Sequence, residues 1–128
     1  MADIIQLAEA VAHEVEGELM FAPELDLKGI KEMRTIVVPC GLGCKPISRG
    51  SNEDTLKVQV GVLKKCTEDE IVDLVNTVIT LGKGFLDKRL AGAKCTHIEY
   101  SPLYSPEHLR ERRQFTGVVE LTFKAVGP

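Results

Sequence analysis

The sequence has few aromatic residues and no long apolar run. It contains no Trp, two Tyr and four Phe, so aromatic side chains make up 5% of the chain. Because proteins that bind single-stranded nucleic acid stack bases on aromatic side chains, this scarcity argues against that function. No stretch of about 18 or more apolar residues is present, so we expect no membrane-spanning helix. The acidic N-terminal segment lacks the basic region of a signal peptide, and we expect a cytosolic protein.

Size and charge are those of an ordinary globular domain. The 128 residues carry 16 Lys and Arg against 19 Asp and Glu, which gives a net charge of −3. Apolar residues make up 44% and charged residues 27%, values typical of soluble folds. We therefore expect a single domain over residues 1–128. The acidic balance disfavours general binding to nucleic acid, which depends on neutralising phosphates.

Four cysteines leave two interpretations open. Cys40 and Cys44 have the spacing found in structural zinc sites, with Cys66, Cys95 or His97 as further ligands. The second closely spaced pair that such a site needs is missing. We therefore expect four reduced thiols, no bound metal and no cofactor. The alternative is a small metal-binding enzyme that uses these Cys and His residues.

Two segments have the apolar spacing of amphipathic helices. In residues 3–17, apolar side chains recur every three or four positions, and Asp3 is a candidate N-cap. A second helix is expected from about residue 68 to at least residue 81. Before it, Thr67 and Glu70 match a capping box, in which each side chain hydrogen-bonds the backbone N–H of the other residue.

Alternation of apolar and polar residues predicts strands. Residues 114–126 show this pattern, and residues 19–22, 33–38 and 95–104 are further candidates. Each clear strand has one apolar face and one polar face, which is typical of an antiparallel or mixed sheet with one side exposed to water. The clearest case is the strand whose apolar positions are Leu56, Val58, Val60 and Val62.

Residues 40–53 have the composition of a loop. They contain three Gly, together with Pro, Ser and Asn, and they separate two predicted strands. Loops of this length inside compact domains are usually functional or mobile. The sequence therefore predicts a long mobile loop at about residues 40–53.

Together these elements predict an α+β fold. We expect a two-layer sandwich with a mostly antiparallel or mixed sheet of four to five strands. Two amphipathic helices are expected to pack on one face of this sheet.

Common signatures of nucleotide binding and catalysis are missing. Residues 82–85 lack the spaced glycines and the following Ser or Thr of a P-loop. Gly41 and Gly43 form a short Gly-rich stretch, but it leads into no predicted helix N-terminus, where phosphate groups bind. The sequence therefore offers no recognisable signature of an enzyme.

The most distinctive segment lies at residues 101–116. Two Ser-Pro steps bracket Leu103 and Tyr104, and each Pro favours an extended conformation in the residue before it. A charged stretch with Arg110, Arg112 and Arg113 follows. This pattern fits either a solvated loop or an exposed loop that docks to a partner, since Arg is favoured in protein interfaces.

Residues 101–116 resemble a segment of small virion proteins from long-tailed bacteriophages and prophages. Upstream features agree in order: Val-Val-Pro-Cys-Gly at residues 37–41, Ser-Arg-Gly-Ser at 48–51, the alternating strand at 55–63 and the helix after Thr67. Over nearly its whole length the chain is thus similar to tail terminators, also called tail-completion proteins or minor tail proteins of the U type.

This resemblance implies a structural function. Tail terminators form a ring, typically six-fold, that caps the tail tube and provides the surface that meets the head. The implied partners are other copies of the chain, the major tail tube protein and a head–tail connector protein, with DNA passing through the channel without specific binding. The implied location is the head-proximal end of the virion tail, after assembly in the host cytoplasm.

A connector or stopper subunit at the head–tail junction is the main alternative. No membrane association is implied. The candidate subunit or partner contacts are Arg110, Arg112, Arg113, Tyr104, Ser48 and Arg49.

Overall fold

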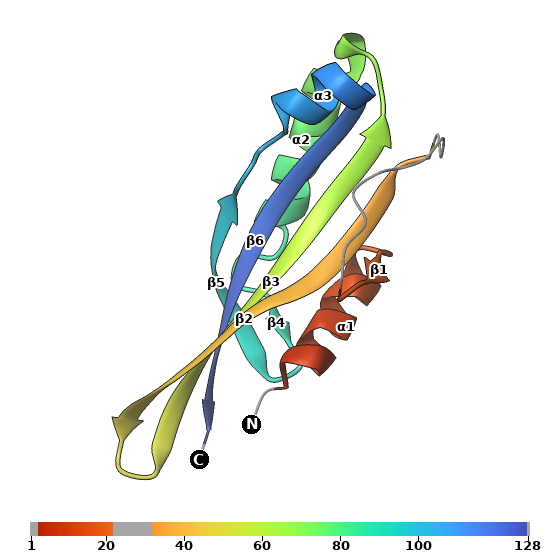
Figure 1. Cartoon of the computed structure of the whole chain (residues 1–128). Coiled ribbons are helices and arrows are strands. Elements are labelled where there is room, and N and C mark those ends of the chain that lie inside the picture. The colour runs from red at the N-terminus through yellow and green to blue at the C-terminus, as the bar shows by residue number, and fades with distance from the viewer. Residues whose placement is uncertain (1–2, 22–31, 128) are drawn as a thin grey trace.

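The computed structural model describes residues 3–21 and 32–127 (Figure 1). In this part of the chain it has three α-helices, one short 3-10 helix and six strands. Their order is α1 (Ile4–Glu14), β1 (Glu18–Leu19), β2 (Arg34–Ser48), β3 (Ser51–Lys65), η1 (Glu68–Glu70), α2 (Ile71–Lys83), β4 (Arg89–Leu90), β5 (Ala93–Tyr100), α3 (Pro106–Arg112) and β6 (Gln114–Gly127).

The strands form one sheet in the order β1-β2-β3-β6-β5-β4. The β1–β2 pair is parallel and the other neighbours are antiparallel, so the sheet is mixed. The predicted α+β class is confirmed. The sequence pattern did not predict β4, which has only two residues. It also did not predict that residues 106–112 form a complete helix. Both elements are too short to produce a recognisable apolar period.

The inner face of the sheet is apolar. The side chains of Leu56, Val58, Val60 and Val62 are fully buried, as their alternation predicts. They pack in one group with residues of α1 and in a second with residues of α2, so both helices cover this face. The first group includes Leu7, Ala8 and Val11 of α1, and the second includes Leu74 and Val78 of α2 together with Phe115.

The outer face of the sheet is largely polar. Lys57 of β3 lies 3.6 Å from Glu120 of β6, and Lys124 of β6 lies 3.4 Å from Glu53 of β3. These ion pairs are partly exposed and contribute little to stability. They nevertheless confirm that the alternating polar side chains of β3 and β6 lie on the face exposed to water.

The predicted loop at residues 40–53 is wrong. Its residues belong to β2 and β3, which form a long hairpin that turns at Arg49 and Gly50. Gly50 has a φ of +79°, a conformation that glycine adopts without strain. The Gly-rich composition predicted a loop because composition reports only local backbone flexibility. It does not reveal that these residues pair with β3, which in turn pairs with β6.

This hairpin extends beyond the helices as an arm (Figure 1). We call residues 40–56 the arm. Near the tip of the arm, Asn52 pairs with Gly127, so the end of β6 forms a third strand of it. Strand β1 pairs only with Ile36 and Val37 of β2. The outer edge of β2 along the arm therefore has no strand partner within the described residues.

The capping box predicted at Thr67 is formed only in part. The Thr67 hydroxyl caps no backbone N–H in the described structure, and α2 begins at Ile71 after the 3-10 turn of η1. The Glu70 carboxylate accepts a hydrogen bond of 2.7 Å from Lys64 and, as predicted, also one from the backbone N–H of Thr67, and both lower the pKa of the Glu70 carboxyl. By contrast, the Asp3 cap is confirmed, because its carboxylate accepts from the N–H of Ile5 at 2.8 Å.

None of the helices in the described part of the chain is both long and apolar enough to cross a membrane.

Substitution of the two cap residues should have unequal effects. Asp3→Ala should lower the free energy of unfolding by about 1 kcal/mol, the usual cost of losing an N-cap. Thr67→Ala should cost less, because no capping hydrogen bond is lost. Urea denaturation of both variants measures this difference. A larger loss for Thr67→Ala would contradict this assignment of the caps.

Gly82 should not tolerate a methyl group. A Cβ there would lie 2.5 Å from the hydroxyl oxygen of Tyr100, which donates a 2.6 Å hydrogen bond to the Ile79 carbonyl. We expect Gly82→Ala to destabilise the protein by about 1–3 kcal/mol, the usual cost of overpacking, although Ala normally favours a helix. Gly84→Ala is the matched control, since its Cβ would meet only backbone atoms at 3.4 and 3.5 Å. Equal thermal stability of the two variants would contradict the close packing of Tyr100 on α2.

Candidate functional site

The segment after β5 is fixed to the sheet edge. The Ser101 N–H donates to the Val118 carbonyl at 2.9 Å, and the Val118 N–H donates to the Pro102 carbonyl at 2.9 Å. Further along, the Ser105 N–H donates to the Thr116 carbonyl at 2.9 Å. The Pro-cornered segment is thus an extension of the sheet rather than a free loop.

Helix α3 begins and ends at well-defined residues. The Ser105 hydroxyl oxygen accepts from the His108 N–H at 3.2 Å, and Pro106 occupies the first turn, where its missing N–H costs nothing. At the other end, Arg113 has a φ of +50°, and its N–H donates to the Leu109 carbonyl at 3.1 Å. This left-handed residue ends the helix and turns the chain into β6.

A polar group anchors α3 to β6. His108 Nδ1 lies 2.8 Å from the hydroxyl of Thr116, and the Gln114 side-chain amide donates to the same hydroxyl at 2.9 Å. Both Gln114 and Thr116 are buried. The His108 side chain is partly buried in this contact. Because buried polar groups need partners, this group fixes where α3 lies on the sheet.

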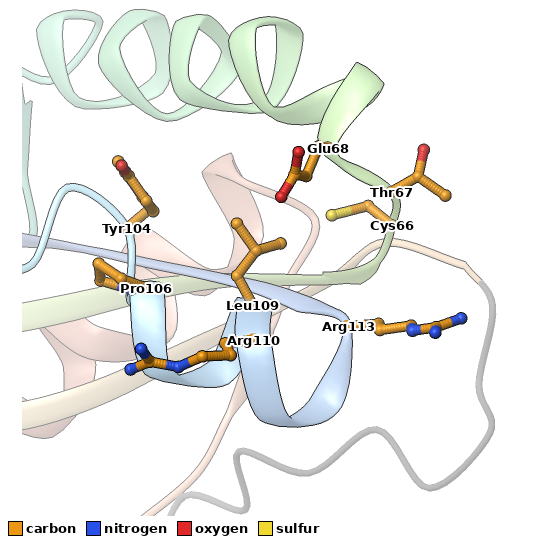
Figure 2. Close-up of a pocket in the computed structure, with 8 residues that line it drawn as sticks. All are labelled: Cys66, Thr67, Glu68, Tyr104, Pro106, Leu109, Arg110 and Arg113. Carbon is orange, nitrogen blue, oxygen red and sulfur yellow. The ribbon is translucent and has the colours of Figure 1, made fainter.

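A pocket of about 580 Å³ lies between α3 and the chain that leads into α2 (Figure 2). It forms where β3 ends, because the Cys66 N–H donates to the Arg113 carbonyl at 3.0 Å and Lys65 Nζ donates to the Arg112 carbonyl at 3.1 Å. These bonds join the end of β3 to the end of α3. The pocket is lined by Cys66, Thr67, Glu68, Tyr104, Pro106, Leu109, Arg110 and Arg113.

The pocket combines an apolar base with charged groups of both signs. The Leu109 side chain points into the space between α3 and η1, and Cys66 and Tyr104 border the same space (Figure 2). Glu68 faces this space, while the guanidinium groups of Arg110 and Arg113 point outward on either side of α3 (Figure 2). These three charged side chains form no ion pair with any described residue. They are therefore available to an external group.

The structure brings together only part of the predicted contact set. Tyr104, Arg110 and Arg113 line the pocket, whereas Arg112 is exposed and lies outside its lining. Ser48 and Arg49 lie at the tip of the arm. Strand β3 spans the distance between these two places, and at about 3.3 Å per residue its 15 residues separate them by roughly 45 Å.

Sequence reasoning missed several lining residues. Cys66, Thr67 and Glu68 follow β3, while Pro106 and Leu109 belong to α3. No spacing in the sequence links the two segments, since they meet only through the pairing of β3 with β6. The Pro-Glu-His-Leu pattern at residues 106–109 was the one available signal, because a Leu among charged residues marks the buried side of a short helix.

The arm exposes apolar side chains from its base, where Leu42 pairs with Leu56, to its tip. Leu42 is 64% exposed and Ile47 is 48% exposed, and Val126 at the adjacent end of β6 is 66% exposed. Lys45 lies 3.7 Å from Glu53, while Arg49 forms no ion pair with a described residue. Exposed apolar side chains gathered on one projection are typical of surfaces that become covered by a partner.

The four thiols are free and fall into two classes. Cys40 and Cys44 on the arm are exposed, whereas Cys66 and Cys95 are buried. The pKa is raised at all four thiols, by burial at Cys40, Cys66 and Cys95 and by a hydrogen bond to Asp54 at Cys44. Within the described residues, no three Cys, His, Asp or Glu side chains are grouped as metal ligands would be.

Thiol labelling should separate these two classes. Because the pKa is raised at all four thiols, exposure to the reagent is what separates the two classes. We expect an aromatic disulfide reagent at pH about 8, just below the ordinary thiol pKa, to react with Cys40 and Cys44 in the folded protein. Cys66 and Cys95 should react only after unfolding. Replacing Cys40 and Cys44 with Ser should remove the fast phase. Rapid reaction of all four thiols would contradict the burial of Cys66 and Cys95.

No protein-family model matches this chain, and no curated protein matches it. The features of this chain that bear on its function are therefore the segment at residues 101–116, the arm and the pocket.

Proposed function

We propose that this chain is the subunit of a tail terminator of long-tailed bacteriophages. In this role, copies of the chain form a ring that caps the tail tube, stops its growth and offers a surface to the head. The observation that carries the proposal is the resemblance of residues 101–116 to such proteins, together with the agreement of the upstream segments in order.

The geometry of the described residues supports a subunit that works in contact with other proteins. The resembling segment is held rigidly on β6 and forms one wall of the pocket. At the far end of β3, the arm carries exposed apolar side chains. A subunit with contact surfaces at two separate ends suits a ring, because head-to-tail contacts that close by rotation generate rings.

The proposed role is structural and involves no catalysis. The partners are further copies of the chain, six in the ring by resemblance, with the major tail tube protein below and a connector protein above. DNA passes through the channel, and a net charge of −3 suits a channel to which DNA must not adhere. The proposed location is the head-proximal end of the virion tail.

Removing the protein from a phage or prophage that encodes it tests this function. Without it, tails should grow to uncontrolled lengths and fail to join heads, as seen by negative-stain electron microscopy. Supplying the wild-type chain should restore tails of uniform length. Tails of normal length that remain unattached to heads would instead indicate the connector role, and normal virions would overturn both.

A variant at the pocket adds a second test. Arg110→Glu with Arg113→Glu should keep the fold, since both side chains are exposed, but should fail to restore tail length. Asp73→Lys on the exposed side of α2 is the matched control and should restore it. If the arginine variant restores tail length and Asp73→Lys does not, the contact surface lies on α2 and not at the pocket.

A further inference from the structure

The arm and the pocket have complementary chemistry. The pocket offers the apolar side chains of Leu109 and Tyr104, with the carboxylate of Glu68 beside them. The arm tip offers the exposed side chain of Ile47 and, two residues later, the guanidinium of Arg49. Neither charged group forms an ion pair with a described residue. An apolar group next to a cation on the arm thus has a counterpart in an apolar surface next to an anion in the pocket.

A second pair of complementary charges has an anion on the arm and cations at the pocket. Asp54 lies on β3 of the arm, opposite Cys44, and forms no ion pair with a described residue. Arg110 and Arg113 lie on the pocket side. Complementary charges at both positions fix the orientation of a contact as well as favouring it.

One chain cannot bring its own arm and pocket together. They lie at opposite ends of β3, roughly 45 Å apart along a strand that is paired on both sides. Moving the arm toward the pocket would require breaking the pairing of β3 with β6. Whatever fills the pocket must therefore come from another molecule.

We propose that the arm tip of one copy, at Ile47 and Arg49, inserts into the pocket of the next copy, where Arg49 pairs with Glu68. This inference rests on the proposed function, in which copies of the chain form a ring. The contact is heterologous, because it joins different surfaces on the two copies. Each subunit then uses its arm once and its pocket once.

The size of the pocket suits such an insertion. A volume of about 580 Å³ is within the range of pockets that hold compact ligands, so it accommodates a few side chains. A single contact of this kind is small. Closure of the ring makes every subunit engage at two sites, so modest contacts act together.

Disulfide trapping tests the contact directly. In a chain with Cys40→Ser, Cys44→Ser and Cys66→Ala, which removes the native thiols of the arm and the pocket, Ile47→Cys supplies a thiol on the arm and Thr67→Cys supplies one at the pocket rim. Mild oxidation of the assembled protein should give covalent oligomers that disappear on reduction. Thr77→Cys in place of Thr67→Cys is the matched control, because Thr77 is an exposed residue of α2 outside the pocket, and it should give none.

Charge exchange provides an independent test. Arg49→Glu and Glu68→Arg should each weaken assembly by at least about tenfold, since each places like charges together. The double variant should regain most of the wild-type assembly, measured by native mass spectrometry and sedimentation. Circular dichroism of each variant verifies that the fold is kept.

The possible results separate this contact from the proposed function. If rings form but no disulfide joins Ile47→Cys to Thr67→Cys, and the double charge variant does not regain assembly, the proposed contact is wrong. The proposed ring would still stand. Trapping and rescue in a protein that does not restore tail length would support the contact and overturn the terminator function. Trapping at Thr77 equal to that at Thr67 would also overturn the contact.

Discussion

The rest of the structure depends on the pairing of β3 with β2 on one side and β6 on the other. This pairing runs from Asn52 opposite Gly127 to Lys65 opposite Gln114, which is nearly the whole length of β3. Because side chains alternate between the faces of a strand, this register determines which residues of three strands meet the helices. A shift by one residue would turn the Val and Leu side chains of β3 toward water and place Lys57 beneath α1. The packing of α1 and α2 is therefore a consequence of the strand register.

The length of β3 also determines how the molecule can be used. At one end β3 leads through Cys66 into the pocket, and at the other it enters the arm. Both surfaces are attached to the same central strand, so their separation and relative orientation are fixed in the folded chain. In the proposed ring, this fixed separation would set the spacing between neighbouring copies. The buried contact of His108 with Thr116 extends this rigidity to α3.

The sequence predicted the strands and helices whose apolar residues recur at a regular spacing, because that spacing reflects burial of one face. The alternation at Leu56 to Val62 and the helical spacing around Leu7 and Val11 both reflect contact with a core, and both predictions are confirmed. The arm was missed because Gly and Pro report local backbone freedom, whereas the pairing that holds these residues as strands includes the distant end of β6, where Gly127 pairs with Asn52. The Thr67 hydroxyl does not cap α2, and the Glu70 side chain is shared between Lys64 and the Thr67 backbone, a contact set that the capping-box spacing does not reveal. In the pocket, Tyr104, Arg110 and Arg113 were predicted as contact residues, but Leu109 and Cys66 meet only through the tertiary fold.

The outer edge of β2 has a consequence for how the free subunit behaves at high concentration. Beyond Val37 this edge has no neighbouring strand within the described residues, and unpaired edges invite uncontrolled joining of sheets. Two irregularities in the register, next to Pro39 and Pro46, interrupt the edge and leave only a short regular stretch between them. Proline and bulges are devices by which natural sheets resist fibre formation. The arm can therefore be long and uncovered without becoming a template for amyloid-like growth.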